Sequence, residues 1–274
     1  MKLAIAPLVA ALVALGGSGC DGKASAAASA KSDSSLARVK KLGVILWGAD
    51  VIGGVPYVYE NPQKPATYLG FEKDIADAIS RDLGVEVRLL VKAWDTLVPE
   101  LQRGTFDMVM NGIEDTPDRA KIVLFSEPYY VYSQQITVQK DAQAIDSIDG
   151  LKGKKVATLS GTAAEDILRR TPDIQVITHP EIIYSYKDLE EGKVDAVLLD
   201  TPIAVAYGAS NSKLKNVGES FAEGRYVIAF RNEDKSLRDA VNKALRTLKK
   251  NGELKKIYEK WGIMDGHQAQ IGIE

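Results

Sequence analysis

The stretch Leu101-Gln-Arg-Gly104-Thr-Phe106-Asp107-Met-Val109 is matched further along the chain by Leu189-Glu-Glu-Gly192-Lys-Val194-Asp195-Ala-Val197. Each copy is typical of a helix end, a glycine that closes the helix, and a strand that enters the core. Two copies at a domain-sized separation indicate two similar lobes, since a solenoid needs three or more short repeats. Helix, glycine and strand follow one another in many α/β proteins, so the matched spacing and the paired aspartates carry this prediction.

The sequence around the first copy alternates between strands and helices. We expect strands over residues 42–46, 85–91 and 106–110, and helices over residues 71–83 and 95–103. The apolar residues of the first helix recur at every fourth position, and Gly84 ends it. Short connections of this kind predict an α/β fold with a largely parallel sheet.

The second copy lies in a similar run, with strands expected over residues 154–158, 194–199 and 227–230. The helices after residue 230 have no strand partners nearby, so we expect them to return to the first lobe. The chain then crosses between the lobes twice, near Gln139 and near Phe230, which permits hinge closure around a ligand. Lobe 1 is therefore predicted to be discontinuous (residues 38–138 and 231–265), and lobe 2 comprises residues 139–230.

Charge and composition exclude several classes of function. The chain has 35 Lys and Arg against 37 Asp and Glu, so it lacks the basic excess typical of proteins that bind nucleic acid. It has two histidines and one cysteine, which excludes an internal disulfide framework, Cys/His zinc sites and most histidine-based catalysis. We therefore expect no metal and no cofactor.

The first residues have the composition of a secretory signal peptide. Residues 1–19 combine a positive start at Lys2, an apolar stretch from Leu3 to Leu15, and a small-residue end. The apolar stretch is too short for a spanning helix, which needs ~20 residues. The alternative is a buried N-terminal helix, but the stretch is not amphipathic.

Cys20 follows this segment directly, and the sequence around it resembles a bacterial lipoprotein processing site. Gly17 departs from the usual residue three positions before the cysteine, and ordinary cleavage near residues 24–30 would instead give a soluble periplasmic protein. Lipidation at Cys20 would supply a membrane anchor, and Asp21 resembles an inner-membrane retention residue. Residues 20–37 are predicted to be a flexible tether.

Polar residues gather where the predicted strands end, and ligands of open α/β sheets bind beyond the carboxyl ends of strands. Asp50, the segment from Asn111 to Arg119, the segment 160–165 and Asp200 all lie at such ends. Arg119 suits a ligand carboxylate, as does the helix start at Thr162, while Asp200 suits an ammonium. Together these groups describe a clamp for a zwitterion, although Arg119 could also form a surface ion pair with a neighbouring acid.

Several segments, taken in order, resemble the polar amino acid-binding proteins of ABC importers (bacterial extracellular solute-binding proteins, family 3). They are Leu69-Gly70-Phe71, Gly104-Thr-Phe-Asp107, Thr116-Pro-Asp-Arg119, Phe125-Ser126-Glu-Pro128-Tyr129, Ser160-Gly161-Thr162 and Ile257-Tyr258-Glu-Lys260-Trp261. The resemblance covers about residues 40–262. It implies a two-lobed periplasmic binding protein type II fold, and a monomer that captures an amino acid in the periplasm and delivers it to an ABC permease and ATPase complex.

The resemblance also assigns roles to individual residues. Arg119 is implied to pair with the ligand carboxylate, together with the loop amides at Thr162 and Ala163. Asp200 is implied to bind the α-ammonium, with help from the backbone at Gly112. Further ligand-binding residues are expected around these, namely the wall residue Trp94, the acidic Asp50, and Asn111 and Glu114.

The sequence departs from the family pattern at three places. Glu114 stands where Ser or Thr is usual, Ala163 lacks a common hydroxyl, and the loop at Gly53-Gly54 has one extra residue in place of an aromatic. Glu114 could pair with Arg119 and weaken carboxylate binding. It could instead face the ligand and form an acidic pocket with Asp50 and Asp200, which favours a cationic amino acid such as arginine or lysine.

Two other functions remain open at this point. Cyclohexadienyl dehydratase is similar in fold, and Glu114 could act there as a general acid. A sensory module that reports ligand occupancy to a separate membrane partner is the second alternative. The leading interpretation is transport, because ligand capture needs no catalytic group.

Overall fold

The computed structural model describes residues 33–52, 54–142 and 145–274, and residues 33–274 belong to one unit. The predicted signal peptide, Cys20 and the first part of the predicted tether lie outside the described residues. Among the described helices, none has both the length and the apolar character that crossing a bilayer requires.

The first sheet, with the helices packed on it, forms lobe 1. Its strand order is β4-β1-β5-β12-β6, in which β1 pairs in parallel with β4 and β5 while β12 runs antiparallel. These strands are β1 (Val44–Ala49), β4 (Glu86–Val91), β5 (Met108–Val109), β6 (Leu124–Phe125) and β12 (Ala229–Phe230). The helices are α1 (Ser35–Leu42), α2 (Phe71–Leu83), η1 (Trp94–Thr96), α3 (Leu97–Arg103), α4 (Pro117–Ala120), α8 (Lys235–Lys250), α9 (Glu253–Lys260) and η4 (Gly266–Ile271), and a small ribbon pairs β2 (Tyr59–Glu60) with β3 (Tyr68–Leu69).

The second sheet forms lobe 2 and has the strand order β11-β7-β10-β8-β9. Its parallel part is β10-β8-β9, and β7 and β11 run antiparallel to their neighbours. The strands are β7 (Tyr130–Gln139), β8 (Lys155–Leu159), β9 (Gln175–His179), β10 (Ala196–Asp200) and β11 (Leu214–Tyr226). The helices are η2 (Asp149–Leu151), α5 (Ala163–Arg170), α6 (Ile182–Glu190), α7 (Thr201–Ile203) and η3 (Ala204–Ala209).

The repeated phrase of the sequence has the same structure in both lobes. Gly104 and Gly192 follow α3 and α6 with φ near +82° and +70°, the left-handed region that glycine enters without strain. The Asp107 carboxylate then accepts the amide of Leu46 at 2.9 Å, and Asp195 accepts that of Lys155 at 2.7 Å. Each aspartate thus ties its strand to the neighbouring parallel strand, which explains the matched spacing.

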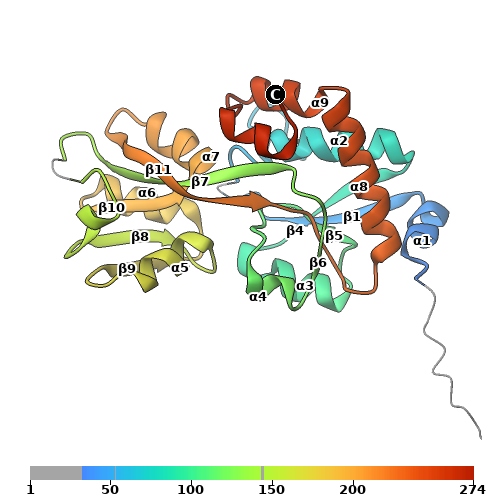
Figure 1. The fold of residues 1–274 in the computed structure, drawn as a ribbon, viewed down its shortest axis with the longest axis horizontal. Helices are drawn as coiled ribbons and strands as arrows, with labels where there is room; N and C mark the ends of the chain where they lie inside the picture. Colours follow the sequence, from blue (N-terminus) through green and yellow to red (C-terminus); the bar gives the residue numbers. More distant parts are fainter. Residues whose placement is uncertain (1–32, 53, 143–144) are drawn as a thin grey trace, which may run out of the picture. The chain divides into compact units, whose positions relative to one another are not determined.

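The connection between the lobes consists of β7 and β11, which lie side by side (Figure 1). Tyr130 and Tyr226 are paired at the lobe 1 end of these strands, and Gln139 and Leu214 at the far end. The predicted crossings near Gln139 and Phe230 are therefore too late in the sequence. The sequence of β7 mixes apolar, aromatic and polar residues, and it did not indicate which sheet the strand joins.

An aromatic cluster fills the start of this connection. The Tyr226 ring stacks on Tyr132 and Tyr130, with centroids 4.6 and 5.7 Å apart, and Tyr258 of α9 meets Tyr130 edge-on at 5.2 Å. Such pairs contribute about 0.5–1.5 kcal/mol each beyond the area they bury. The hinge strands are thus fixed firmly to the core of lobe 1.

The last helices of the chain pack on lobe 1, where α8 contacts α1, α2 and β6. The ends of the lobe differ from the prediction. The helix α1 begins at Ser35, inside the expected tether, because its buried Val39 packs in the core. Residues beyond 265 also belong to the fold, since the buried Gln268 bonds to both backbone groups of Val131.

Candidate functional site

A cavity lies between the strand ends of the two sheets, and its space, together with its opening to solvent, is about 460 Å³. Both lobes contribute to its wall. Most of the predicted site residues line it, namely Asp50, Trp94, Asn111, Gly112, Glu114, Thr162 and Asp200. Arg119 and Ala163 do not line the cavity, because Glu114 lies between them and it.

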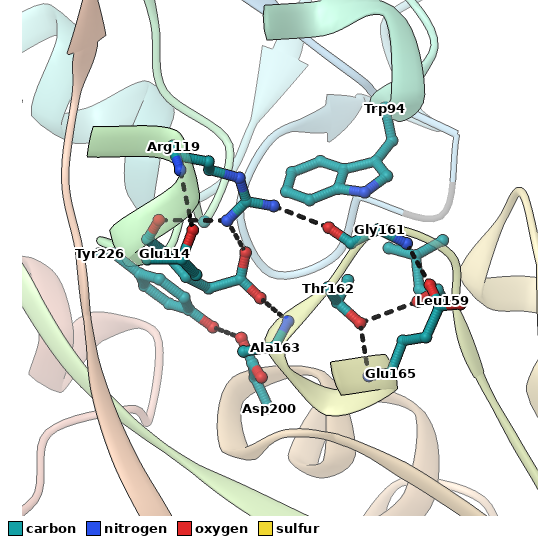
Figure 2. A network of polar contacts seen from close by, with 12 residues as sticks. Trp94, Glu114, Arg119, Leu159, Gly161, Thr162, Ala163, Glu165, Asp200 and Tyr226 are labelled. Carbon is teal, nitrogen blue, oxygen red and sulfur yellow. Dashed lines mark hydrogen bonds and ion pairs between the residues drawn. The ribbon is translucent and has the colours of Figure 1, made fainter. Parts of the chain in front are cut away.

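Glu114 is the centre of the polar network at this site (Figure 2). Its side chain is 2% exposed and forms an ion pair with Arg119. The other carboxylate oxygen accepts a hydrogen bond of 2.8 Å from the amide of Ala163, the first residue of α5. Glu114 therefore pairs with Arg119 and also lines the cavity, so the two positions expected from the sequence do not exclude each other.

Arg119 is held by several groups at once. Its backbone amide donates to the Thr116 hydroxyl, which caps α4, and its Nη1 also donates to the Glu114 carbonyl at 3.1 Å. Nη2 donates to the carbonyl of Gly161 in lobe 2 at 2.7 Å, and the guanidinium lies 5.6 Å from the centre of the Trp94 ring. The Arg119 side chain therefore has partners in both lobes.

Trp94 is half-buried, lines the edge of the cavity and also packs against the apolar cores. Its Nε1 donates across to the carbonyl of Ser160 at 3.0 Å. The loop that it meets turns at Gly161 with φ +73° and enters α5 at Thr162, whose hydroxyl accepts the amide of Glu165. Trp94, Glu114 and Arg119 thus all join lobe 1 to this one loop of lobe 2.

Asp200 lies at the end of β10 and is buried. Its oxygens accept hydrogen bonds from Gln134 Nε2, at 2.6 Å, and from the hydroxyl of Tyr226. Burial and the negative charge of Glu114 raise the pKa of Asp200 to about 8. A cation in the cavity would compensate for both effects.

Two tyrosines at the cavity, Tyr57 and Tyr226, were not among the predicted site residues. Their hydroxyl oxygens are 2.6 Å apart. The Tyr226 hydroxyl donates its hydrogen bond to Asp200. It can therefore only accept from Tyr57, and the Tyr57 hydroxyl is the donor of this second bond. Burial raises the pKa of both tyrosines well above the usual value, so both remain donors. The sequence carried no pattern that could have found them.

The side of the cavity formed by lobe 1 rests on Asn111, Gly112 and Glu72. The Asn111 side chain accepts the amide of Asp50 at 2.9 Å, and burial raises the pKa of Asp50. The amide of Gly112 donates to the fully buried Glu72 at 2.6 Å. Gly112 has φ +64°, and a Cβ there would lie 2.8 Å from the Tyr57 ring, so the position requires glycine.

The remaining wall is apolar and was also not predicted. It includes Leu159, Ile182 and Ile203. Within the described part of the chain, no three His, Cys, Asp or Glu side chains are placed to hold a metal ion together.

Comparison with known proteins gives the family. The model of the bacterial extracellular solute-binding proteins, family 3, matches residues 51–264. The chain belongs to this family. The L-cystine-binding protein of Escherichia coli (strain K12) is 32% identical to this solute-binding protein over 229 residues, which are 82% of this chain and 85% of the relative.

Solved structures of related binding proteins share the fold of this solute-binding protein. An ancestral arginine-binding protein bound to glutamine is 35% identical, with a TM-score of 0.76 over 81% of this chain and 99% of that one. An ancestral amino acid-binding protein that is a precursor of cyclohexadienyl dehydratase is 33% identical, with a TM-score of 0.77 over 82% and 98%. The fold is the two-lobed type II periplasmic binding fold, as the resemblance implied.

Proposed function

We propose that this solute-binding protein is the substrate-binding component of an ABC transporter. It captures an amino acid or a related ammonium-bearing solute between its lobes and delivers it to a membrane permease. The observation that carries the proposal is the cavity with Asp200 at its wall, at the junction of two lobes that share a hinge. The names of the relatives, which bind cystine or arginine, support an amino acid-like ligand.

The acidic lining favours a cationic solute. Asp50, Glu114 and Asp200 face the cavity, and an ammonium or guanidinium group would compensate for their burial. Arginine and lysine meet this requirement among the amino acids, and simple amines meet it as well.

A thermal-shift screen with the twenty amino acids and small aliphatic amines tests the proposal. A ligand at 100 times its dissociation constant stabilises the folded protein by about 2.7 kcal/mol, which gives a measurable shift in Tm. Asp200→Asn should abolish the shift, and Asp166→Asn, the same change on the exposed face of α5, should leave it intact. A screen without any stabilising compound would refute the proposal.

We propose further that the chain is not an enzyme, although one structural relative is a precursor of a dehydratase. A general acid must carry a proton. Both oxygens of Glu114 instead accept hydrogen bonds, from Arg119 and from Ala163, which does not suit that role. Turnover of prephenate or arogenate by the purified protein would contradict this proposal.

A lipid anchor at Cys20 completes the proposal and would hold the protein at the periplasmic face of the inner membrane. The support is the position of the cysteine directly after the predicted signal peptide. Labelling with palmitate should be lost in Cys20→Ser, and equal labelling of both proteins would exclude the anchor.

A further inference from the structure

The charged residues that line the cavity, among those the structure describes, are all acidic: Asp50, Glu114 and Asp200. A cationic group on a ligand would therefore find several acceptors. A carboxylate group on a ligand would instead face these acidic groups at close range, and each of them that is ionised would repel it, in a site where burial weakens screening by water. The lining thus selects strongly by the sign of the ligand's charge.

Several groups that could hold an anion at this edge are already engaged. Arg119 Nη1 bonds to the Glu114 carboxylate and Nη2 to the Gly161 carbonyl. The Ala163 amide at the start of α5 bonds to Glu114, and the Gly161 amide bonds to Glu165 at 2.6 Å. A ligand carboxylate could reach Arg119 and Ala163 only by displacing the buried Glu114 side chain.

Glu114 itself remains able to accept more hydrogen bonds. A carboxylate has about four lone-pair sites, and Arg119 and Ala163 use one on each oxygen. The same holds for Asp200, whose oxygens accept from Gln134 and Tyr226. Both residues line the cavity, so an ammonium there can donate to either of them.

The rest of the cavity suits a hydrocarbon chain. Leu159, Ile182, Ile203 and the Trp94 ring provide apolar surface between the acidic groups. A ligand with a hydrocarbon chain and a charged end would therefore meet both apolar and acidic surface in this cavity.

We propose that Glu114 acts as a built-in carboxylate, which occupies the anion position, so that the protein selects aliphatic amines that lack an α-carboxylate. Diamines and amines with a guanidinium end are the simplest members of this class. Glu114 is then the residue that determines specificity. This inference rests on the proposed function and narrows its ligand.

Matched ligand pairs test the inference with the purified full-length protein. Agmatine and arginine, cadaverine and lysine, and putrescine and ornithine each differ only in the α-carboxylate. Calorimetric titration should show that at least one amine binds ten times more tightly than its parent amino acid. Tighter or equal binding of the parent in every pair would overturn the inference.

The failure of the inference can be told apart from that of the proposed function. If no amine binds and any of the twenty amino acids does, the transport proposal stands and the role of Glu114 is refuted. If neither the amines nor the amino acids bind, both are refuted.

Variants at position 114 provide a second test. Glu114→Thr frees Arg119 and the Ala163 amide, so the preference should reverse, with the parent amino acids gaining at least tenfold. Glu114→Gln keeps the shape of the side chain without its charge, so amine binding should fall tenfold with no gain for amino acids. Retention of the amine preference in either variant would overturn the inference, and the Gln variant serves if the Thr variant fails to fold.

Discussion

The Glu114 carboxylate of lobe 1 accepts a 2.8 Å hydrogen bond from the Ala163 amide of lobe 2. The same carboxylate is paired with Arg119, which donates to Gly161 on the same loop. An anion that belongs to the chain therefore connects the two lobes beside the cavity. This relationship has consequences for stability as well as for binding.

Substitution of one member of the buried Glu114–Arg119 ion pair should destabilise the protein more than substitution of both. Arg119→Met leaves the Glu114 charge buried without its partner, so the free energy of unfolding should fall by about 3 kcal/mol. In the double variant Glu114→Gln/Arg119→Met the loss should be clearly smaller, because no unpaired charge remains. Urea denaturation measures both effects.

The exposed pair Arg88–Glu86 provides the control for this experiment. Arg88→Met should change stability little, because exposed ion pairs contribute little. Equal losses for Arg119→Met and Arg88→Met would show that the buried pair has no special role.

The raised pKa of Asp200 predicts that the affinity for a cationic ligand depends on pH. The pKa of Asp200 is about 8 in the free protein, raised by burial and by Glu114, and a bound cation would lower it. Below pH 8 binding must therefore release a proton, so affinity should rise by up to tenfold per pH unit from pH 6 and level off above pH 8. An alkylamine keeps its own charge over this range, since its pKa is about 10.

Calorimetry in buffers of different ionisation enthalpy counts the released protons. The neighbouring groups are Glu114, Arg119, Tyr57, Tyr132 and Tyr226, and the pKa shifts of the three tyrosines keep them protonated over this range. An affinity that stays constant between pH 6 and 8, without proton release, would contradict the assignment of Asp200.

The contact between Trp94 and Ser160 predicts a role in holding the lobes closed. Trp94→Phe keeps an aromatic wall but loses the 3.0 Å hydrogen bond across the cleft. One such bond contributes about 1 kcal/mol, so ligand release should become about fivefold faster. Stopped-flow measurement of dissociation tests this expectation.

Trp261 is the matched control, because its Nε1 bonds to Asp74 within lobe 1 at 2.7 Å. Trp261→Phe removes the same kind of hydrogen bond and should leave the release rate unchanged. The interlobe role of Trp94 would be refuted if both variants released the ligand at the same rate.

Substitution of the two repeated aspartates should lower the free energy of unfolding by different amounts in the two lobes. Asp107 is buried and is paired with Arg38 at 2.7 Å, whereas Asp195 is exposed. Asp107→Asn should lower the free energy of unfolding by about 3 kcal/mol and Asp195→Asn by about 1 kcal/mol. Urea denaturation tests the difference, and equal losses would show that only the shared hydrogen bond to the neighbouring strand matters.

Local patterns predicted much of the fold. The apolar spacing and the glycines at 84 and 104 placed α2 and α3, and the repeated phrase indicated two lobes whose matching aspartates the structure explains. The crossings were placed too late in the sequence. The residue pattern of a strand that connects two lobes does not differ from that of a strand within one lobe. The aromatic contacts that fix Tyr130 and Tyr226 are tertiary.

The candidate site was also predicted only in part, because some of its residues are brought together by tertiary contacts. Acidic and polar residues at strand ends were found because sheet topology brings such ends together. Tyr57 and Tyr226 come from a loop and a hinge strand far apart in sequence, and only the folded chain places their hydroxyls 2.6 Å apart. The sequence left open whether Glu114 pairs or lines the cavity, since side-chain direction depends on contacts across the lobes.

The paired strands β7 and β11 also determine how the two lobes can move relative to each other. Their ladder runs from Tyr130 and Tyr226 to Gln139 and Leu214, with register shifts around Phe221. A hydrogen-bonded ribbon bends across its face more easily than its strands slide past each other, and the irregular register is where bending is easiest. The two lobes should therefore open and close by rotation about a single hinge axis. Each opening would then present the same two edges to whatever receives the ligand.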